Sequence, residues 1–312
     1  MTTRATDPAF RLRLGTRRSA LAMAQSGMVA GALEERHEGL AVELVPIVTQ
    51  GDVIPGDLAK HGGKGLFTRE LESGLLDGSL DLAVHSLKDL PVSLPEGLAV
   101  CAHPKRADPR DVLVSEAAED LDGLPEGAVV LTGALRRRAQ ILMRRPDLRV
   151  EPVRGNVDTR LRKWRESGAA GVVLAAAGLQ RLGLQGFPAH PVPTGILLPA
   201  PGQGTLAIEV RVGGLASTLC CVLDDPPTAR AAAAERRVVA AFGGDCTLPL
   251  AAWARPEGDG GALRLTALLA TPDGRHAARG EAVGECPEEV TAACVVAMRA
   301  DGADEVLERI RR

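Results

Sequence analysis

The sequence predicts an α/β protein with two α/β domains and one smaller α+β domain. Two observations predict this class. Short apolar runs alternate with helix-like segments through the first two thirds of the 312 residues, which is typical of mostly parallel sheets with crossover helices. The last third carries apolar runs joined by a Pro-Asp-Gly turn, which is typical of antiparallel strands. The predicted domains are 1–104 with 205–222, then 105–204, and finally 223–312.

In the first third, apolar runs predict strands at 12–16, 42–48, 80–87 and 97–103. Ser19 is expected to cap the helix that follows the first strand. The apolar positions of that helix, at helical spacing, are Leu21, Ala24, Met28 and Ala32. A glycine-rich loop at 61–65 leads to a second helix, whose apolar face is expected to carry Phe67, Leu71 and Leu75.

In the rest of the chain, strands are predicted at 111–115, 128–132, 148–153, from 171 and at 205–211. Helices are predicted at 134–145, 158–166 and 225–242, the last with prolines in its first turn. A turn-rich stretch at 191–204 reads as a crossing between domains. Three antiparallel strands at 248–254 and within 263–283 precede a closing helix from residue 287 to the end.

Composition narrows the possible functions. The net charge of −3 gives no basic field for nucleic acid, and two Trp, four Phe and no Tyr leave few residues for stacking on bases. The N-terminus lacks the apolar core of a secretory signal, and no run reaches the roughly 20 apolar residues of a membrane span. We therefore expect a cytoplasmic protein without a membrane partner. Its six cysteines show no metal-binding spacing, so no metal is expected.

Basic side chains recur where the predicted strands end. The ends of strands contribute Arg17, Arg18, Lys88, Arg136, Arg137, Arg138, Arg154 and Arg160, and the loop 60–65 contributes Lys60 and Lys64. Ligands of open parallel sheets bind at the carboxyl ends of strands. Arginines at a helix start also oppose the helix dipole, so a surface helix would not favour them there. The pattern predicts a site for a polyanion, whether carboxylate or phosphate.

Two residues stand apart from this basic set. Asp89 could neutralise Lys88 or cap a turn, or it could stabilise a cationic intermediate or shuttle a proton. Cys246 follows Gly243-Gly244-Asp245 after a predicted helix. It could be an inert loop thiol or a thiol exposed for covalent attachment.

Several motifs occur together and in a fixed order. They are TRRSALAMAQ (16–25), GGKGLF (62–67), HSLKDLP (85–91), LRRRAQ (135–140), RGNVDTRL (154–161) and GGDCTLP (243–249). With them the chain resembles the porphobilinogen deaminase (hydroxymethylbilane synthase) family from about residue 11 onward. The resemblance implies three domains, the first two similar to type II periplasmic binding proteins. It also implies the head-to-tail condensation of four porphobilinogen molecules with release of ammonia, and a monomer.

The resemblance further implies a dipyrromethane cofactor, joined by a thioether to Cys246. Asp89 would be the catalytic carboxylate that stabilises the cation left when ammonia departs. The cofactor would also be bound by Ser86, Lys88, Thr132, Gly133, Ala134, Arg136, Arg137, Arg154 and Arg160. The incoming porphobilinogen and the growing pyrrole chain would meet Arg17, Ser19, Gln25, Lys60, Lys64, Phe67 and Arg181. Each pyrrole carries an acetate and a propionate, so basic residues suit this ligand.

Two departures from the family pattern stand out. Gly133 and Ala134 replace serines that are usual there, so two hydroxyl groups that could bind cofactor carboxylates are missing. We expect weaker anchoring of the cofactor, without necessarily a loss of activity. Asp245 stands where glycine is common, and its charge would disfavour a neighbouring thiolate. Two alternatives therefore stay open: a paralogue that binds a pyrrole carboxylate with little turnover, and an unrelated anion-binding module.

Overall fold

The computed structural model describes residues 10–53, 65–243, 248–258 and 260–312. Contacts divide the chain into two units. The first unit comprises Met1–Lys105 and Leu206–Pro226, and the second comprises Arg106–Thr205 and Pro227–Arg312. The further division of the second unit into the predicted domains 105–204 and 223–312 stays a prediction.

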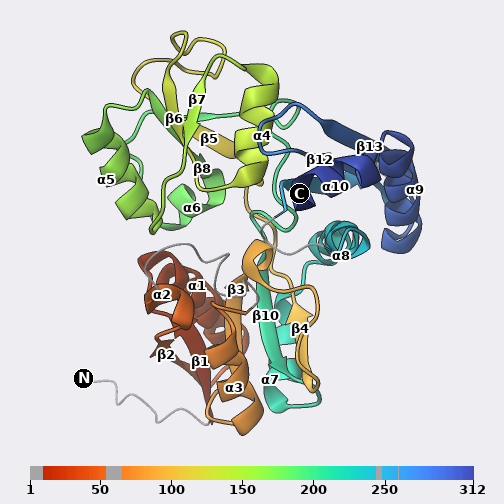
Figure 1. The fold of residues 1–312 in the computed structure, drawn as a ribbon. Helices are drawn as coiled ribbons and strands as arrows, with labels where there is room; N and C mark the ends of the chain where they lie inside the picture. Colours follow the sequence, from red (N-terminus) through yellow and green to blue (C-terminus); the bar gives the residue numbers. More distant parts are fainter. Residues whose placement is uncertain (1–9, 54–64, 244–247, 259) are drawn as a thin grey trace. The chain divides into compact units, whose positions relative to one another are not determined.

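The first unit is a five-stranded sheet in the order β2-β1-β3-β10-β4 (Figure 1). Its strands are β1 (Phe10–Arg17), β2 (Leu40–Ile47), β3 (Leu82–Ser86), β4 (Leu98–Ala102) and β10 (Leu206–Arg211). Its helices are α1 (Ala20–Arg36), α2 (Gln50–Val53), α3 (Arg69–Asp77) and α7 (Leu215–Cys220), with 3-10 turns η2 (Leu87–Asp89) and η3 (Cys221–Leu223). The buried leucines of β1 pack against α1 and α7 on one face of the sheet, and Leu71 and Leu75 of α3 cover the other.

The second unit opens with a sheet of the same layout, β7-β6-β8-β5-β9. Its strands are β5 (Asp111–Val114), β6 (Val129–Leu131), β7 (Arg149–Glu151), β8 (Gly171–Ala175) and β9 (Ala189–Pro191). Its helices are α4 (Leu135–Arg144), α5 (Val157–Ser167) and α6 (Ala176–Arg181). Ile141 of α4 lies in the core on one face, and Trp164 of α5 lies in the core on the other.

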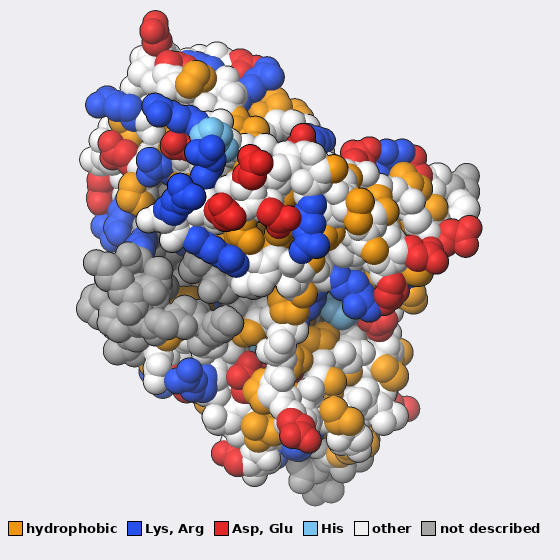
Figure 2. Space-filling view, turned by 45° about the vertical axis from the view of Figure 1, so that its right-hand side comes forward, with side chains coloured by type: hydrophobic (Ala, Val, Ile, Leu, Met, Phe, Trp, Pro, Cys, Tyr) orange, Lys and Arg blue, Asp and Glu red, His pale blue; other side chains and the backbone are white. Residues whose placement is uncertain are grey.

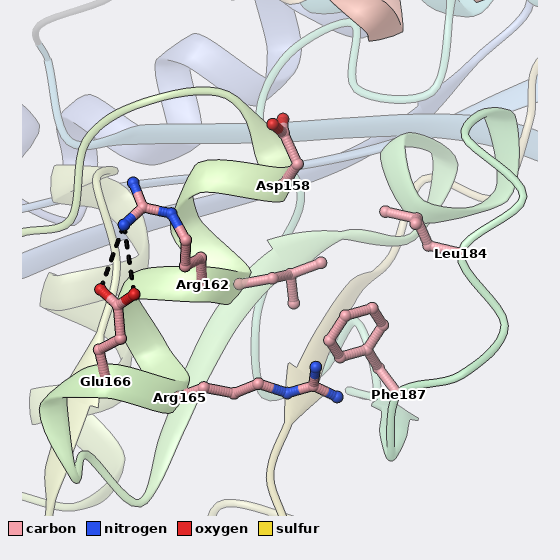
Figure 3. A pocket seen from close by; sticks show the side chains of 7 residues that line it. Asp158, Arg162, Arg165, Glu166, Leu184 and Phe187 are labelled. Carbon is pink, nitrogen blue, oxygen red and sulfur yellow. Dashed lines mark hydrogen bonds and ion pairs between the residues drawn. The ribbon is translucent and has the colours of Figure 1, made fainter.

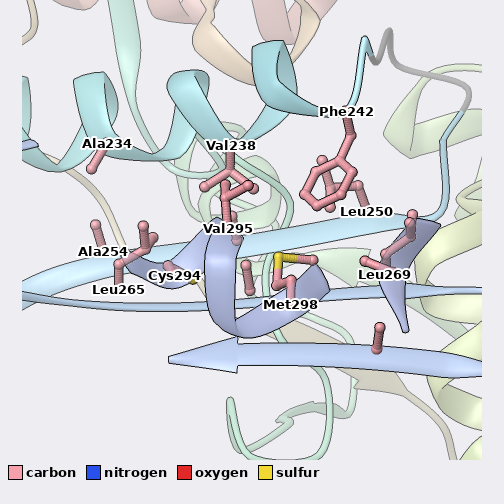
Figure 4. Close-up of a cluster of buried hydrophobic side chains, with 14 of the residues drawn as sticks. Ala234, Val238, Phe242, Leu250, Ala254, Leu265, Leu269, Cys294, Val295 and Met298 are labelled. Carbon is pink, nitrogen blue, oxygen red and sulfur yellow. The ribbon is translucent and has the colours of Figure 1, made fainter. Parts of the chain in front are cut away.

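The third sheet, also in the second unit, is antiparallel: β11 (Leu250–Glu257), β12 (Ala262–Ala270) and β13 (Ala277–Gly284). One core joins it to α8 (Pro226–Ala241), α9 (Pro287–Ala300) and α10 (Ala303–Arg311), with Val238, Leu265 and Met298 among its fully buried side chains (Figure 4). A second, small cluster joins Ala251 and Leu268 of this sheet to Leu198. The prediction of three antiparallel strands is therefore confirmed.

The two five-stranded sheets repeat one plan that the sequence does not reveal as a repeat. In each, three parallel strands are followed by one antiparallel strand, which is β10 in the first sheet and β5 in the second. Each of these reversing strands is the first strand after the chain passes from one unit to the other. As a consequence, the loop after β1 corresponds to the loop after β6, and both loops carry predicted site residues.

Among the differences from the prediction, three have a clear physical reason. Met28 is 56% exposed, and α1 instead buries Gln25, Ser26, Val29, Ala30 and Leu33, because the polar Gln25 turns toward β3. The short strand β9 was not predicted, since it lies beside prolines in a turn-rich stretch. The closing segment forms two helices, not one, because the chain turns at Gly302 with φ +91°, a conformation that glycine adopts at little cost.

Candidate functional site

In the first unit, three predicted residues meet where β1, α1 and β3 come together. Ser19 caps α1, as predicted, with its hydroxyl accepting a hydrogen bond from Ala22 N at 3.3 Å. The amide of Gln25, one and a half turns later, donates to the Ser86 hydroxyl at 3.0 Å. Gln25 is buried at 4% exposure, so this bond fixes the end of β3 to the first turns of α1.

Arg17 and Phe67 form a second contact in the first unit. The Arg17 guanidinium carbon lies 4.1 Å from the centre of the Phe67 ring, within the range of a cation–π interaction. The ring fills the space beside Gly51, where an added Cβ would lie 2.1 Å from a ring carbon. Gly51 also donates a backbone hydrogen bond to Leu66 at 2.7 Å. Gly51 and Arg17 therefore hold Phe67 ahead of α3.

Lys88 and Asp89 lie on the 3-10 turn that directly follows β3. The turn is closed by a backbone hydrogen bond from Leu90 to Leu87 at 3.1 Å, and both of these leucines are buried. The two buried leucines anchor the turn, while Lys88 is half-buried and Asp89 is exposed. Asp89 is thus a solvent-accessible carboxylate on a turn that two buried leucines anchor.

In the second unit, the loop after β6 carries Thr132, Gly133 and Ala134. Thr132 is buried and its hydroxyl accepts a 3.4 Å hydrogen bond from Ala134 N. Ala134 occupies the N-cap position of α4 and supplies no side-chain cap. An added Cβ on Gly133 would lie 2.7 Å from the carbonyl oxygen of Val153, which is closer than Cβ atoms come to backbone atoms in proteins. The glycine therefore lets the ends of β6 and β7 lie this close together.

Arg136 and Arg137 point into the protein and share one carboxylate. Arg136 binds both oxygens of Asp111, at 2.7 and 3.0 Å, and also the Leu198 carbonyl and the Gln203 side chain. Arg137 binds one oxygen of Asp111 through two nitrogens, at 2.9 and 3.1 Å. Both arginines are about 5% exposed and Asp111 is fully buried. Two buried positive charges thus face one buried negative charge.

The excess positive charge changes the acidity of the cluster. Burial alone would raise the pKa of Asp111, but the charges of Arg136 and Arg137 and their hydrogen bonds hold it well below its usual range. Burial lowers the pKa of Arg137 to about 10, and the charges of Arg136 and Arg160 act in the same direction. The cluster therefore keeps all three charges near neutral pH, with a net charge of one positive unit.

In the second unit, four more of the predicted arginines lie after β7 and on α4, α5 and α6. The Nε of Arg160 donates to the Gly155 carbonyl at 2.7 Å, and its guanidinium lies 3.7 Å from the place of a Cβ on Gly133. Arg154 is exposed at the end of β7. Arg181, on α6, donates to the Gly204 carbonyl at 2.6 Å, and burial lowers its pKa to about 10. Arg138, on the solvent side of α4, is exposed.

Charge is distributed unevenly along the chain. Residues 106–205 carry 14 Lys and Arg against 11 Asp and Glu, whereas the whole chain carries 37 against 40. Figure 2 shows a gathering of Lys and Arg side chains on the part of the second unit that carries these residues. The low net charge of the chain therefore conceals a basic segment that suits an anionic ligand.

Three predicted site residues, Cys246, Lys60 and Lys64, lie outside the described residues. The other five cysteines are free thiols. No cluster of potential metal ligands occurs among the described residues, and no described helix is long and apolar enough to cross a membrane. The candidate site is therefore defined by the described side chains that can bind an anion.

A pocket of about 370 Å³ lies elsewhere in the second unit, on α5 (Figure 3). Its walls include Leu184 and Phe187, with the Arg165 guanidinium 4.5 Å from the Phe187 ring and Arg162 paired with Glu166. None of the predicted site residues lines it. This pocket is therefore separate from the predicted anion site.

The sequence prediction missed Asp111 and Gln203, which hold the two buried arginines. A signal for Asp111 was present, because it is an acid at the start of an otherwise apolar strand, DVLV. Gln203 had no such signal, since it lies in a turn-rich stretch and becomes buried only through contacts far along the chain.

Comparison with known proteins shows which family the chain resembles over nearly its full length. The family model described as "Porphobilinogen deaminase, dipyromethane cofactor binding domain" matches residues 12–216, and that of the "Porphobilinogen deaminase, C-terminal domain" matches 229–300. The porphobilinogen deaminase of Rubrobacter xylanophilus is 48% identical over 97% of this chain and 98% of its own. That of Brevibacillus brevis is 44% identical over 96% and 97%. Among solved structures, the methionine-binding protein MetQ is 12% identical, with a TM-score of 0.43, over 68% of this chain and 89% of its own.

Proposed function

The chain belongs to the porphobilinogen deaminase family, and we propose that it joins four porphobilinogen molecules head to tail on a dipyrromethane held by Cys246. The match to the family is near full length, and it includes the domain that binds the cofactor. The individual roles of the residues are our proposals, and they follow from the two sets of side chains described above.

The observation that carries the residue assignment is the excess of buried positive charge around Asp111. A buried charge is costly unless an opposite charge or hydrogen bonds compensate it. One carboxylate of the protein faces Arg136, Arg137 and, nearby, Arg160. A ligand that brings further carboxylates would complete the neutralisation. The acetates and propionates of a dipyrromethane are such groups, so the residues present fit the cofactor.

We assign the roles within the second unit from the donors that remain. A guanidinium has five N–H groups. Four of those of Arg136 have acceptors among the described residues, against three of those of Arg137. Arg137 would therefore hold a cofactor carboxylate directly. Arg154, exposed after β7, and Arg160, beside Gly133, would hold further carboxylates. Arg136 would contribute charge and keep Asp111 in place, while Thr132 and the backbone of Gly133 and Ala134 would add hydrogen bonds.

In the first unit, we assign the catalytic role to Asp89. When bound, the dipyrromethane would supply the free pyrrole carbon to which the first porphobilinogen is joined, and each later unit would join the pyrrole added before it. The exposed carboxylate of Asp89 would stabilise the positive charge that develops as ammonia leaves porphobilinogen. The incoming substrate would be oriented by Arg17, Ser19 and Gln25. Phe67, held by Arg17, would offer it an apolar wall. We propose that the substrate also contacts Arg181, Lys60 and Lys64. Lys88 and Ser86 would bind the cofactor.

The test combines intact-protein mass spectrometry with a substrate assay. We expect a mass excess equal to one dipyrromethane, lost in the variant Cys246→Ser, and consumption of porphobilinogen with release of ammonia. A mass excess without turnover would favour a paralogue that only binds the pyrrole carboxylate. Absence of both would favour an unrelated anion-binding module and overturn the proposal.

We further propose that the enzyme acts as a cytoplasmic monomer whose partners are porphobilinogen and the growing linear pyrrole chain, with no nucleic acid. Its low net charge of −3 supports the last point. Light scattering after size-exclusion chromatography tests the monomer directly, and a mass of about 65 kDa, twice the 32.6 kDa of the chain, would contradict it.

A further inference from the structure

A buried cluster of three titratable side chains lies directly behind the turn that carries Asp89. His85 is the residue before Ser86 in β3, Glu209 lies on β10, and Glu72 lies on α3. Their exposed fractions are 6%, 0% and 9%. The candidate site uses none of the three, although unpaired charges are rarely buried to this degree.

These side chains share one face of the sheet. His85 and Ala207 are register partners in the antiparallel pair β3–β10, and Glu209 is the partner of Ala83. Ala83 belongs to the cluster packed under α3, and side chains two residues apart on a strand point to the same face. His85 and Glu209 therefore lie diagonally across the two strands, beneath α3.

Among the described residues, the His85 imidazole is the one close polar partner of the Glu209 carboxylate. Nε2 of His85 lies 2.9 Å from one carboxylate oxygen of Glu209. Among the described residues, neither oxygen of Glu209 accepts a hydrogen bond of normal geometry. Burial raises the pKa of Glu72 and the charge of Glu209 adds to this rise, while the neighbouring Thr68 hydroxyl and the charge of His85 oppose it. The three groups thus lie close enough to interact electrostatically, and the His85 imidazole is the close polar partner of Glu209.

The cluster joins the elements that deliver the first-unit site residues. β3 ends at Ser86 and leads directly into the turn that carries Lys88 and Asp89. The helix α3 begins at Arg69, two residues after Phe67. β10 holds the end of β3 through the register pair Leu206–Ser86. A change in the contact between His85 and Glu209 would shift the end of β3, and Asp89 would move with it.

We propose that His85 and Glu209 are positioning residues for the reaction, because their contact sets where the turn 86–89 is held. The proposal rests on the proposed function, in which Asp89 is the catalytic carboxylate. Displacement of a catalytic group by roughly 1 Å can cost on the order of 100-fold in rate. The role predicts a loss in kcat without a comparable change in cofactor attachment.

The test compares Glu209→Gln and His85→Gln with Asp81→Asn in the cofactor-loaded enzyme. Asp81 immediately precedes β3, at the end away from the turn, and pairs with Arg13 at 3.1 Å, so this control weakens an ion pair next to the same strand. We expect kcat to fall on the order of 10- to 100-fold in both test variants. KM, the cofactor mass and the circular dichroism spectrum should stay near those of the unchanged enzyme, and Asp81→Asn should keep kcat within about twofold.

Two outcomes would overturn the inference. In one, both test variants retain the kcat of the unchanged enzyme. In the other, Asp81→Asn loses as much kcat as they do, which would point to general destabilisation of the sheet. Failure of the proposed function is separate from both, because there the unchanged enzyme itself would not consume porphobilinogen.

Discussion

The carboxylate of Glu235, on α8, accepts hydrogen bonds from both terminal nitrogens of Arg106, at 2.6 and 3.2 Å. The same carboxylate accepts the backbone N–H of Gly202 at 2.6 Å and that of Ala254 at 2.8 Å. Arg106 begins the second unit, and Gly202 lies just before the chain leaves it. One fully buried side chain thus fixes both crossing segments to the helix α8 and to β11.

This geometry predicts a large loss of stability in Glu235→Gln. The amide removes the negative charge and leaves the guanidinium of Arg106, only 12% exposed, without its partner. Breaking a buried pair in this way costs about 3–5 kcal/mol. Urea denaturation followed by circular dichroism measures the loss, and the transition midpoint should fall clearly.

The matched control for this prediction is Arg144→Gln. Arg144 pairs with Asp122 at 2.5 Å, but both side chains are close to half exposed. Exposed pairs contribute about 0–1 kcal/mol. Equal losses in the two variants would show that burial of the Arg106–Glu235 pair is not what gives it its strength.

We expect opposite effects on stability when the two missing hydroxyl groups after β6 are restored one at a time. In Gly133→Ser, the new Cβ would lie 2.7 Å from the Val153 carbonyl oxygen, so the end of β6 or β7 must move. Crowding of this kind costs about 1–3 kcal/mol. Ala134→Ser places a hydroxyl at the N-cap of α4, which has no side-chain cap, and should stabilise by about 0.5–2 kcal/mol.

Thermal unfolding of the two serine variants, with the mass of the attached cofactor, checks this pair. Gly133→Ser should lower the melting temperature and Ala134→Ser should raise it. If Gly133→Ser is as stable as the unchanged protein and holds the cofactor equally well, the close approach of Val153 has no consequence. The departure from the family pattern at residue 133 would then be neutral.

Most elements of the fold could be predicted from the sequence, because their apolar periodicity is local. β1, β3 and α4 lie where the pattern placed them. The antiparallel direction of β5 and β10 could not be predicted, since strand direction is set by crossings between distant segments. The buried face of α1 was mistaken for the same reason: Gln25 is buried through its hydrogen bond to Ser86, 61 residues away.

The site was predicted unevenly. Basic residues at strand ends, and the motifs around them, identified Arg136, Arg137 and Arg160 as a group. The acceptor that organises two of them, Asp111, is 25 residues before Arg136 and was recognised only through the structure. Sequence patterns place a charged residue on an element, but the partner that fixes its side chain depends on how the elements pack.

Arg160→Gln tests the second-unit assignment with a control on the same helix. Arg160 lies beside Gly133 and adds its charge to that around Arg137, whereas Arg162 is 62% exposed and paired with Glu166. A charge-assisted hydrogen bond contributes about 1.5–3 kcal/mol, or roughly 10- to 150-fold in affinity. Arg160→Gln should therefore slow cofactor assembly from porphobilinogen, followed by mass spectrometry, and Arg162→Gln should leave it unchanged.

Asp89→Asn should separate turnover from cofactor attachment. The amide keeps the shape of the exposed side chain on the turn after β3 but cannot stabilise a developing positive charge. Loss of one electrostatic contact of this kind lowers kcat by about 10²–10³-fold. The cofactor mass should persist, because the second-unit residues are unchanged. A variant that turns over at the normal rate would remove Asp89 from the catalytic role.

Asp111→Asn should destabilise the protein in a way that depends on pH. At pH 7 the variant leaves Arg136 and Arg137 buried without their shared anion, at a cost of about 3–5 kcal/mol. The pKa of Asp111 in the folded protein lies well below the ordinary value of 3.8, so its contribution is fully present above that value. Below it the unfolded chain binds a proton that the folded protein does not.

The stabilisation by Asp111 should therefore shrink by about 1.4 kcal/mol per pH unit as the pH falls below about 3.8. Urea denaturation of both proteins at pH 7, 5 and 3 checks this, with the difference in unfolding free energy as the measured quantity. The difference should be the same at pH 7 and near pH 5, and clearly smaller at pH 3. A difference that stays constant to pH 3 would mean that Asp111 has an ordinary pKa in the folded protein, and that the two arginines do not hold it as an anion.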